Sequence, residues 1–214
     1  MFKYYFFDLD GTLTDPGIGI TNSVMHALKA YGISVEDRST LYSFIGPPLK
    51  DSFMKYYGFS EDKASGAISY YREYFSTRGL FENEMYEGIP DILCKLKSRG
   101  IKLILATSKP DEFSIRILKH FGLLEYFDFI AAATMDEKRT SKAEVITYAI
   151  ESLDIKDRSE VLMIGDREHD IKGAKANNIM SAGVLYGYGD LYELKEAGAD
   201  YIVETPEGLL DLPY

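Results

Sequence analysis

The sequence predicts an α/β protein in which a parallel β-sheet is covered by helices on both faces. From residue 86 onward, short and wholly apolar runs alternate with segments of helical periodicity. This pattern is typical of parallel strands that are buried on both sides. The region from Ile18 to about Leu80 has helical periodicity alone. We therefore expect a small all-helical unit inserted after the first strand.

The expected strands are short. The first is Phe2–Phe7, and later candidates are 103–107, 127–133, 161–164, 181–185 and 201–203. Between them, helical periodicity covers 89–97, 111–121, 141–153 and 171–176. In open parallel sheets, ligands bind beyond the carboxyl ends of the strands. Polar residues that directly follow a strand are therefore the first candidates for a functional site.

The inserted region is divided by glycine and proline. Helical periodicity stops at Gly32, Gly58 and Gly79, and the segment Gly46-Pro47-Pro48 interrupts it once more. Glycine and proline commonly end helices in this way. The spacing predicts several short helices joined by tight connections.

Composition restricts the partners that the protein can have. The chain has 214 residues and a formal net charge of −10, so non-specific binding to nucleic acid or to an anionic membrane is not expected. Any anionic substrate needs cations placed locally. The chain shows no signal-peptide pattern and no apolar run long enough to span a bilayer, so a cytoplasmic protein is expected.

The chain has a single cysteine, Cys94, which excludes an internal disulfide. Cys94 falls within the apolar-periodic segment that contains Ile89, Ile92, Leu93 and Leu96. We expect its side chain to pack in the core.

Two carboxylates at the end of the first strand carry the clearest chemical signal. Asp8 and Asp10 are spaced i, i+2, which places both side chains on one face of a strand. Two acids on one face repel each other unless a cation lies between them, and a metal ion is the usual solution. Gly11 permits a sharp turn, and Thr12 offers a hydroxyl and an N–H group to an anion.

Three further segments also follow expected strands. Thr107-Ser108-Lys109-Pro110 places a hydroxyl at a strand end before a helix start, which is an arrangement that binds anions. Thr140-Ser141-Lys142-Ala143 opens the next helix, and Gly165-Asp166-Arg167-Glu168-His169-Asp170 ends the fourth strand.

These four segments resemble, in the same order, the four motifs of the haloacid dehalogenase (HAD) superfamily of phosphohydrolases. The segment from Asp8 to Thr14 resembles the first motif, and Thr107 matches the Thr or Ser of the second. Lys142 resembles the lysine of the third motif, although Lys138 and Arg139 compete with it and Ala143 stands where many relatives have proline. Gly-Asp-x-x-x-Asp at 165–170 resembles the fourth.

The resemblance implies a Rossmann-like core of residues 1–16 and 84–214 with a small helical cap of residues 17–83. It also implies hydrolysis of a phosphomonoester, with Asp8 as nucleophile and Asp10 as general acid and base. Mg²⁺ would be bound by Asp8, the backbone carbonyl of Asp10 and Asp166, while Asp170 would bind a metal-bound water or orient Lys142.

The resemblance further implies which groups meet the substrate. The expected phosphate-binding residues are Gly11, Thr12, Thr107, Ser108 and Lys142. The expected substrate-facing loop of the cap is Gly46, Pro47 and Pro48. The segments 45–49, 165–170 and 185–189 resemble the branch of phosphoglycolate phosphatase-like and 5′-nucleotidase-like enzymes, so a 5′-nucleotide or 2-phosphoglycolate is the expected substrate, acted on by a monomer or homodimer.

Two alternatives remain at this point. A phosphosugar mutase similar to β-phosphoglucomutase would use the same pair of aspartates but return the phosphoryl group to a sugar. A non-catalytic module that binds a phosphorylated ligand would share the acidic pocket and the lysine. Two residues also stay open: Arg167 either adds positive charge near the site or points to solvent, and His169 is expected to have no direct role.

Overall fold

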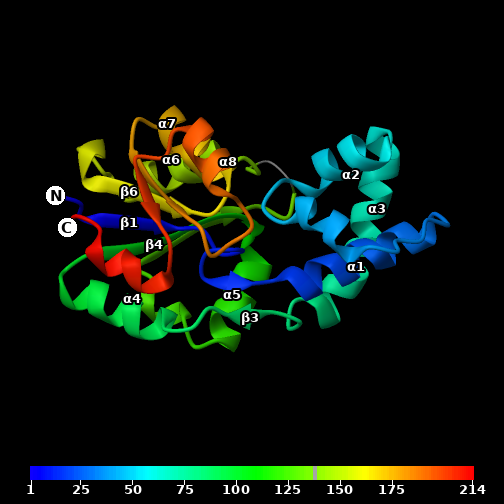
Figure 1. Ribbon diagram of the computed structural model, residues 1–214, viewed down its shortest axis with the longest axis horizontal. Coiled ribbons are helices and arrows are strands. Elements are labelled where there is room, and N and C mark those ends of the chain that lie inside the picture. Colours follow the sequence, from blue (N-terminus) through cyan, green and yellow to red (C-terminus); the bar gives the residue numbers. More distant parts are fainter. Residues whose placement is uncertain (137–138) are drawn as a thin grey trace. The chain divides into compact units, whose positions relative to one another are not determined.

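The computed structural model describes residues 1–136 and 139–214 (Figure 1). The chain divides into two compact units. The core unit consists of Met1–Asp15 and Met85–Tyr214, and the inserted unit is Pro16–Glu84. The two points at which the chain passes between them carry β2 (Thr14–Asp15) and β3 (Glu84–Met85), which pair as a two-stranded sheet.

A six-stranded sheet forms the centre of the core unit. Its strands, in spatial order, are β5 (Phe129–Ala133), β4 (Lys102–Pro110), β1 (Tyr4–Phe7), β6 (Val161–Gly165), β7 (Met180–Val184) and β8 (Tyr201–Val203). Every neighbouring pair is parallel. The prediction of a parallel sheet is therefore confirmed.

Strand β1 lies where the order of the sheet reverses. The chain builds outward from β1 through β4 and β5, and then returns to the other side of β1 with β6. Phe7, the last residue of β1, is paired with Leu105 of β4 and with Ile164 of β6, so the three strands lie side by side at this level, and β4 continues beyond it to Pro110. Side chains just beyond these ends meet at the switch point, where open α/β sheets bind ligands.

Helices cover both faces of this sheet (Figure 1). One face carries α6 (Lys142–Ser152), α7 (Glu168–Ala176) and α8 (Leu191–Ala197), and the other carries α4 (Ile89–Ser98) and α5 (Asp111–His120). Side chains that alternate along the strands build the core on the α6–α7 face. They include Phe6, Ile104 and Met163, which pack with Val145, Ile146 and Ala174.

The inserted unit is built from three helices, α1 (Gly17–Ala30), α2 (Leu49–Tyr57) and α3 (Glu61–Tyr74), with a 3-10 segment at Arg38–Phe44. Its last residues are held against its first helix. The N–H of Gly19 donates to the carbonyl oxygen of Glu82 at 2.9 Å. The Glu82 carboxylate accepts from Asn22 at 2.8 Å and from the Tyr74 hydroxyl at 2.9 Å. The start and the end of the unit are thus fixed to each other.

The side chain of Cys94 is exposed, which corrects the expectation that it packs in the core. Ile89, Ile92, Leu93 and Leu96 do form the buried stripe of α4. Successive residues of an α-helix are rotated by about 100°, so the position after Leu93 turns away from this stripe. The apolar periodicity of α4 is present in the structure, but Cys94 does not belong to the buried stripe.

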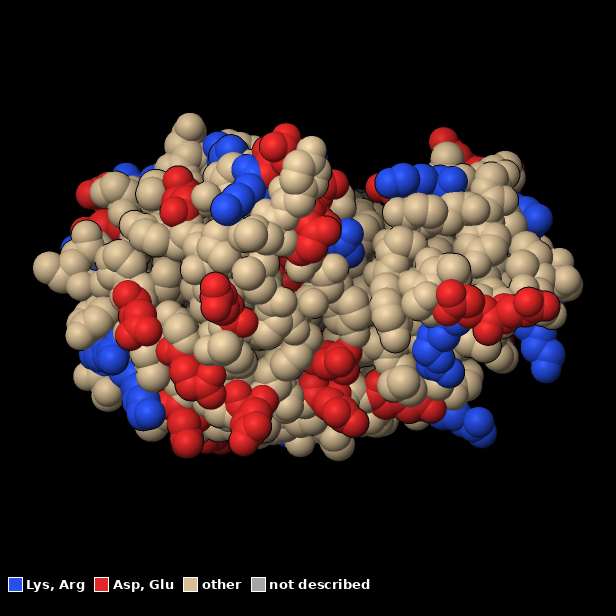
Figure 2. Space-filling view, viewed as in Figure 1, with Lys and Arg blue, Asp and Glu red and all other residues tan. Residues whose placement is uncertain are grey.

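The visible face of the core unit carries clusters of Asp and Glu side chains (Figure 2), in keeping with the net charge of −10. Of the helices in the described part of the chain, none combines the length and the hydropathy needed to cross a bilayer.

Gly19 allows a close backbone contact within the inserted unit. A Cβ atom at this position would lie 1.9 Å from the carbonyl oxygen of Gly79. We expect Gly19→Ala to lower the free energy of unfolding by about 1–3 kcal/mol, because the clash with backbone outweighs the higher helix propensity of alanine. Gly66→Ala in α3 is the matched control, since its Cβ would lie 2.6 Å from the hydroxyl oxygen of Tyr31, which is the far end of a side chain that can move, and not from backbone. Urea unfolding of both variants checks this, and equal stabilities would contradict it.

Candidate active site

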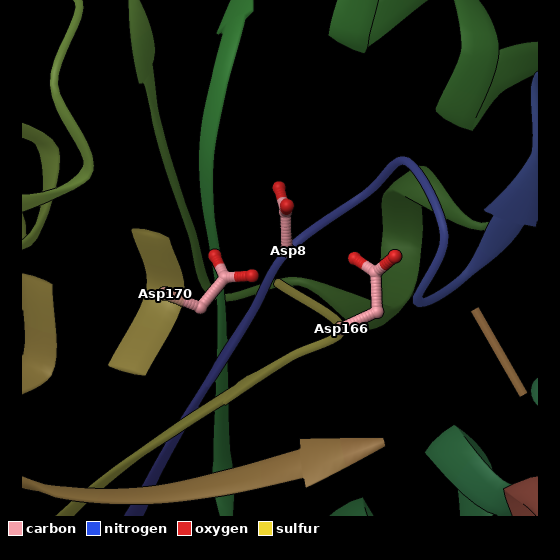
Figure 3. A group of neighbouring side chains, drawn as sticks. All are labelled: Asp8, Asp166 and Asp170. Carbon is pink, nitrogen blue, oxygen red and sulfur yellow. The ribbon is translucent and has the colours of Figure 1, made fainter. Parts of the chain in front are cut away.

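Three carboxylates from different elements converge at the switch point of the sheet (Figure 3). Asp8 directly follows β1, Asp166 directly follows β6, and Asp170 lies in the first turn of α7. One oxygen from each can be chosen so that all three lie within 4.8 Å of one another. All three residues are buried. The N–H of Asp8 donates to the carbonyl oxygen of Ile164 at 2.9 Å, which fixes β1 beside β6 at this level.

Glycines allow the backbone to approach these acids closely. Gly11 has a φ of 79°, and a Cβ there would lie 2.1 Å from Oδ2 of Asp166. A Cβ on Gly187 would lie 2.3 Å from the carbonyl oxygen of Gly11 and 2.4 Å from Cβ of Asp166. The turn after β1 and the loop after β7 therefore both pack directly against Asp166.

Asp166 is the acid with the least compensation from the protein. Its Oδ2 accepts from the N–H of Tyr188 at 2.8 Å, but its Oδ1 has no hydrogen-bond partner among the described residues. Complete burial, followed by the charges of Asp170 and Asp8, raises the pKa of this carboxyl well above its usual value. A buried, unpartnered carboxylate oxygen beside two further carboxylates fits a hard divalent cation such as Mg²⁺.

Lys142 is the first residue of α6, and it bridges two of the acids. Its Nζ lies 2.8 Å from Oδ1 of Asp8 and 2.8 Å from Oδ1 of Asp170, and donates to the carbonyl oxygen of Ala106 at 3.0 Å. Burial alone would lower the pKa of Lys142, but the two carboxylates more than offset this and raise it. For Asp170, burial outweighs the opposing effect of Lys142, so its pKa rises to about 6.

Arg139 and Lys138 were the alternatives to Lys142 in the sequence. Arg139 donates from Nε to the carbonyl oxygen of Ala132 at 2.9 Å and lies over the ring of Tyr148. Lys138 lies outside the described residues.

Sequence reasoning missed Lys109, which forms a second buried ion pair. Its Nζ lies 2.5 Å from Oδ2 of Asp10, and both side chains are nearly inaccessible to solvent. The strand expected from the sequence ends at Thr107, whereas β4 continues to Pro110. With the longer strand, the i, i+2 spacing from Thr107 would have placed Lys109 on the same side as Thr107, and this signal was present in the sequence.

The turn after β1 uses its N–H groups internally. The N–H of Gly11 donates to the carbonyl oxygen of Thr14 at 2.7 Å, and that of Thr12 donates to Leu9 at 3.3 Å. The hydroxyl of Thr12 is fully buried and has no partner among the described residues. Thr107 is buried as well, and Ser108 is half-buried. Contact of these groups with a phosphoryl group stays a prediction.

Arg167 and His169 lie beside the carboxylates, and the backbone N–H of Arg167 donates to Oδ2 of Asp170 at 3.1 Å. Arg167 donates from Nε to Oε1 of Glu193 at 2.8 Å, so its guanidinium is held by an acid of α8. Burial, with Arg167 and other cations nearby, lowers the pKa of His169, which keeps its imidazole neutral at pH 7. Gly46, Pro47 and Pro48 lie between the 3-10 segment and α2 of the inserted unit, and their contact with a substrate stays a prediction.

A parallel sheet with this strand order, and with acids and a lysine gathered at its switch point, is typical of an α/β enzyme whose active site lies at the carboxyl ends of the strands. Residues 5–184 match the family described as haloacid dehalogenase-like hydrolase, and the chain belongs to this family. Helices α1–α3 form a helical region typical of the cap found in it. The chain is accordingly a HAD phosphatase.

Three comparisons illustrate its relatives. A 5′-nucleotidase from Pseudomonas aeruginosa is 46% identical over 88% of this chain and 85% of its own. The tyrosine-protein kinase PtkA of Mycobacterium tuberculosis is 40% identical over 86% of this chain, but this match spans only 62% of its own length. The crystal structure of a predicted phosphatase from Clostridium acetobutylicum is 51% identical with a TM-score of 0.95, covering 99% of this chain and 100% of that one.

Asp166 gives the stability of the metal-free protein a particular pH dependence. A carboxyl whose pKa is raised on folding stabilises the fold fully below its unfolded pKa, and loses that contribution as pH rises through its folded pKa. Asn is neutral at every pH. We therefore expect metal-free Asp166→Asn to gain free energy of unfolding relative to wild type as pH rises from about 4 to about 8.

Urea unfolding in the presence of EDTA checks this expectation. Added Mg²⁺ should then stabilise the wild type but not Asp166→Asn, because the variant lacks one oxygen anion of the site. Asp91→Asn, on the exposed side of α4, is the matched control. A difference between wild type and Asp166→Asn that does not change with pH would contradict the expectation.

Proposed function

We propose that the protein hydrolyses phosphomonoesters in a Mg²⁺-dependent reaction that passes through an aspartyl phosphate on Asp8. One observation supports this above the others. Four buried carboxylates, Asp8, Asp10, Asp166 and Asp170, meet two buried lysines, Lys109 and Lys142, at one end of the sheet. The four acids outnumber the two lysines, so a divalent cation would compensate the remaining negative charge and attract the anionic phosphoryl group.

The metal would be held by Asp8, Asp166 and the backbone carbonyl of Asp10, with Asp170 beside it and bonded to Lys142. When bound, Mg²⁺ would neutralise the charge of the phosphoryl oxygens and so permit the Asp8 carboxylate to approach phosphorus. Lys142 adds a fixed positive charge on the same side, because its Nζ lies 2.8 Å from Asp8.

In the first step, Asp8 would attack phosphorus. Its Oδ1 already accepts from the N–H of Leu9 at 2.7 Å and pairs with Lys142, which leaves Oδ2 to form the new P–O bond. The ester P–O bond breaks, and Asp10 gives its proton to the leaving oxygen. Burial raises the pKa of Asp10 against the opposing effect of Lys109, which favours the protonated form needed here. Thr107 and Lys142 would hold the phosphoryl oxygens, together with Ser108 and the turn at Gly11 and Thr12.

In the second step, the Asp10 carboxylate would take a proton from water. The water oxygen then attacks phosphorus, the bond to Asp8 breaks, and inorganic phosphate leaves. Asp8 returns as a carboxylate and Asp10 as an acid, so both groups are ready for another cycle.

The proposed substrate is a small phosphorylated metabolite, with a 5′-nucleotide as first choice and 2-phosphoglycolate as second. The 5′-nucleotidase relative, at 46% identity, supports the first choice. The loop Gly46-Pro47-Pro48 of the inserted unit is proposed to select the substrate.

A second candidate is transfer of the same phosphoryl group to a hydroxyl acceptor instead of water. The name of the kinase relative favours an acceptor on a protein, and a sugar acceptor would make the protein a mutase. Both reactions would use the aspartyl phosphate but would release no stoichiometric inorganic phosphate.

The test is release of inorganic phosphate from 5′-nucleotides, 2-phosphoglycolate and sugar phosphates, with and without Mg²⁺. We expect Asp8→Asn to abolish release, because no nucleophile remains, and Asp10→Asn to lower kcat by about 10²–10⁴-fold. Asp91→Asn on α4 should keep wild-type rates, since its side chain is exposed and outside the site.

Two results would contradict the proposal. Phosphate release that persists in Asp8→Asn would exclude the covalent intermediate. Transfer to a sugar or a tyrosine hydroxyl without phosphate release would favour the second candidate.

A further inference from the structure

We propose that Lys109 is a positioning residue that fixes the carboxyl group of Asp10, so that a single oxygen of Asp10, Oδ1, exchanges protons with the substrate. This inference rests on the proposed function, because it assigns a role within the same two-step reaction. It gives the two buried lysines separate tasks: Lys142 serves Asp8 and Asp170, and Lys109 serves Asp10.

The contact between the two residues is short and shielded. Nζ of Lys109 lies 2.5 Å from Oδ2 of Asp10, and the exposed fractions of the two side chains are 6% and 11%. A charge-assisted hydrogen bond away from water holds both groups firmly. The other oxygen of Asp10, Oδ1, is buried and has no hydrogen-bond partner among the described residues. One oxygen of this carboxyl is thus occupied and the other is available.

The end of β4 is built to deliver Lys109 to this place. Pairing between β4 and β5 shifts in register between Thr107 and Pro110, so the strand runs past Thr107 with an irregularity. The N–H of Lys109 donates to Oγ1 of Thr107 at 3.2 Å, and its carbonyl oxygen accepts from the hydroxyl of Ser114 in α5 at 3.3 Å. The backbone of Lys109 is therefore tied both to a candidate phosphate-binding residue and to the next helix.

In the proposed reaction, Oδ1 of Asp10 takes part in both proton transfers. When the ester bond breaks, the proton on Oδ1 moves to the leaving oxygen and Asp10 becomes a carboxylate. When water attacks the aspartyl phosphate, its proton returns to Oδ1. Lys109 remains a cation bound to Oδ2 throughout, so it keeps the carboxyl orientation the same for both transfers. Without Lys109 the carboxyl could rotate, and a small misplacement of a reacting group costs about 10²-fold in rate.

The experiment compares two kinds of leaving group in Lys109→Met, which keeps a long unbranched side chain but removes its charge. An alkyl phosphate such as a 5′-nucleotide needs a proton from Asp10 to leave, whereas p-nitrophenyl phosphate does not. Rapid-quench measurement separates formation of the aspartyl phosphate from its hydrolysis.

We expect formation of the aspartyl phosphate to slow by about 10- to 100-fold with the nucleotide but to change little with p-nitrophenyl phosphate. Its hydrolysis should slow equally for both substrates, so that the intermediate accumulates with p-nitrophenyl phosphate. A purely structural role, or a direct contact of Lys109 with the phosphoryl group, would slow formation with both substrates alike, and that result would overturn the inference.

A double-variant comparison tests whether Lys109 acts through Asp10. Adding Lys109→Met to Asp10→Asn should change the rate of hydrolysis of the aspartyl phosphate by less than about twofold, because Asn no longer exchanges a proton there. A multiplied loss in the double variant would overturn the inference. Should Lys109→Met alone not fold, this comparison still stands, since the double variant leaves no unpaired buried charge.

These outcomes are separable from failure of the proposed function. If that function is wrong, the wild type either forms no aspartyl phosphate or passes its phosphoryl group to an acceptor other than water, without stoichiometric release of inorganic phosphate. If only the present inference is wrong, the wild type forms the intermediate and Lys109→Met does not distinguish the two leaving groups.

Discussion

Repulsion between carboxylates that are buried together is the constraint on which the rest of this structure depends. Asp8, Asp166 and Asp170 place oxygens within 4.8 Å of one another in a site closed to solvent. Lys142 bonds to two of them, but Oδ1 of Asp166 is left without a partner among the described residues. A protein tolerates such an arrangement where a cation restores the balance. The cost to the metal-free fold and the capacity to bind a divalent cation are therefore two aspects of one arrangement.

Two features bring these acids together: the strand order of the sheet and the small size of two glycines. Because the strand order reverses at β1, the ends of β1, β4 and β6 lie side by side and each contributes a polar residue. Gly11 and Gly187 then bring two further backbone segments against Asp166 without a side chain between them. Water is displaced from the acids, and the electrostatic interactions inside the site are strengthened accordingly.

Much of this could be predicted from local pattern, and the remainder depends on distant contacts. Apolar runs alternating with helices predicted the parallel sheet. The spacing of Asp8 and Asp10 predicted a cation between them, but both residues lie beyond the end of β1, and the carboxylate of Asp10 pairs with Lys109 instead of joining the cluster of Asp8, Asp166 and Asp170. Lys109 was missed because the expected strand ended at Thr107, although the i, i+2 spacing of Lys109 from Thr107 was visible in the sequence. The two-residue strands β2 and β3 are too short for any period, and Cys94 was misplaced because it is next to the apolar stripe without belonging to it. The hydrogen bond from the N–H of Tyr188 to Asp166 joins two segments that are separated in the sequence, and no pattern in either segment predicts this contact.

The closed ends of the inserted unit have a consequence for how such proteins diversify. Gly19 is bonded to Glu82, and Asn22 and Tyr74 hold the same glutamate, so the 69 residues of the unit begin and end at nearly one place. An insertion with adjoining ends interrupts its host at a single point, and the entropy of closing a loop grows only slowly with its length. Such a segment can be lengthened, shortened or exchanged during evolution while the sheet that receives it stays unaltered. The inserted unit can therefore change without redesign of the residues at the strand ends.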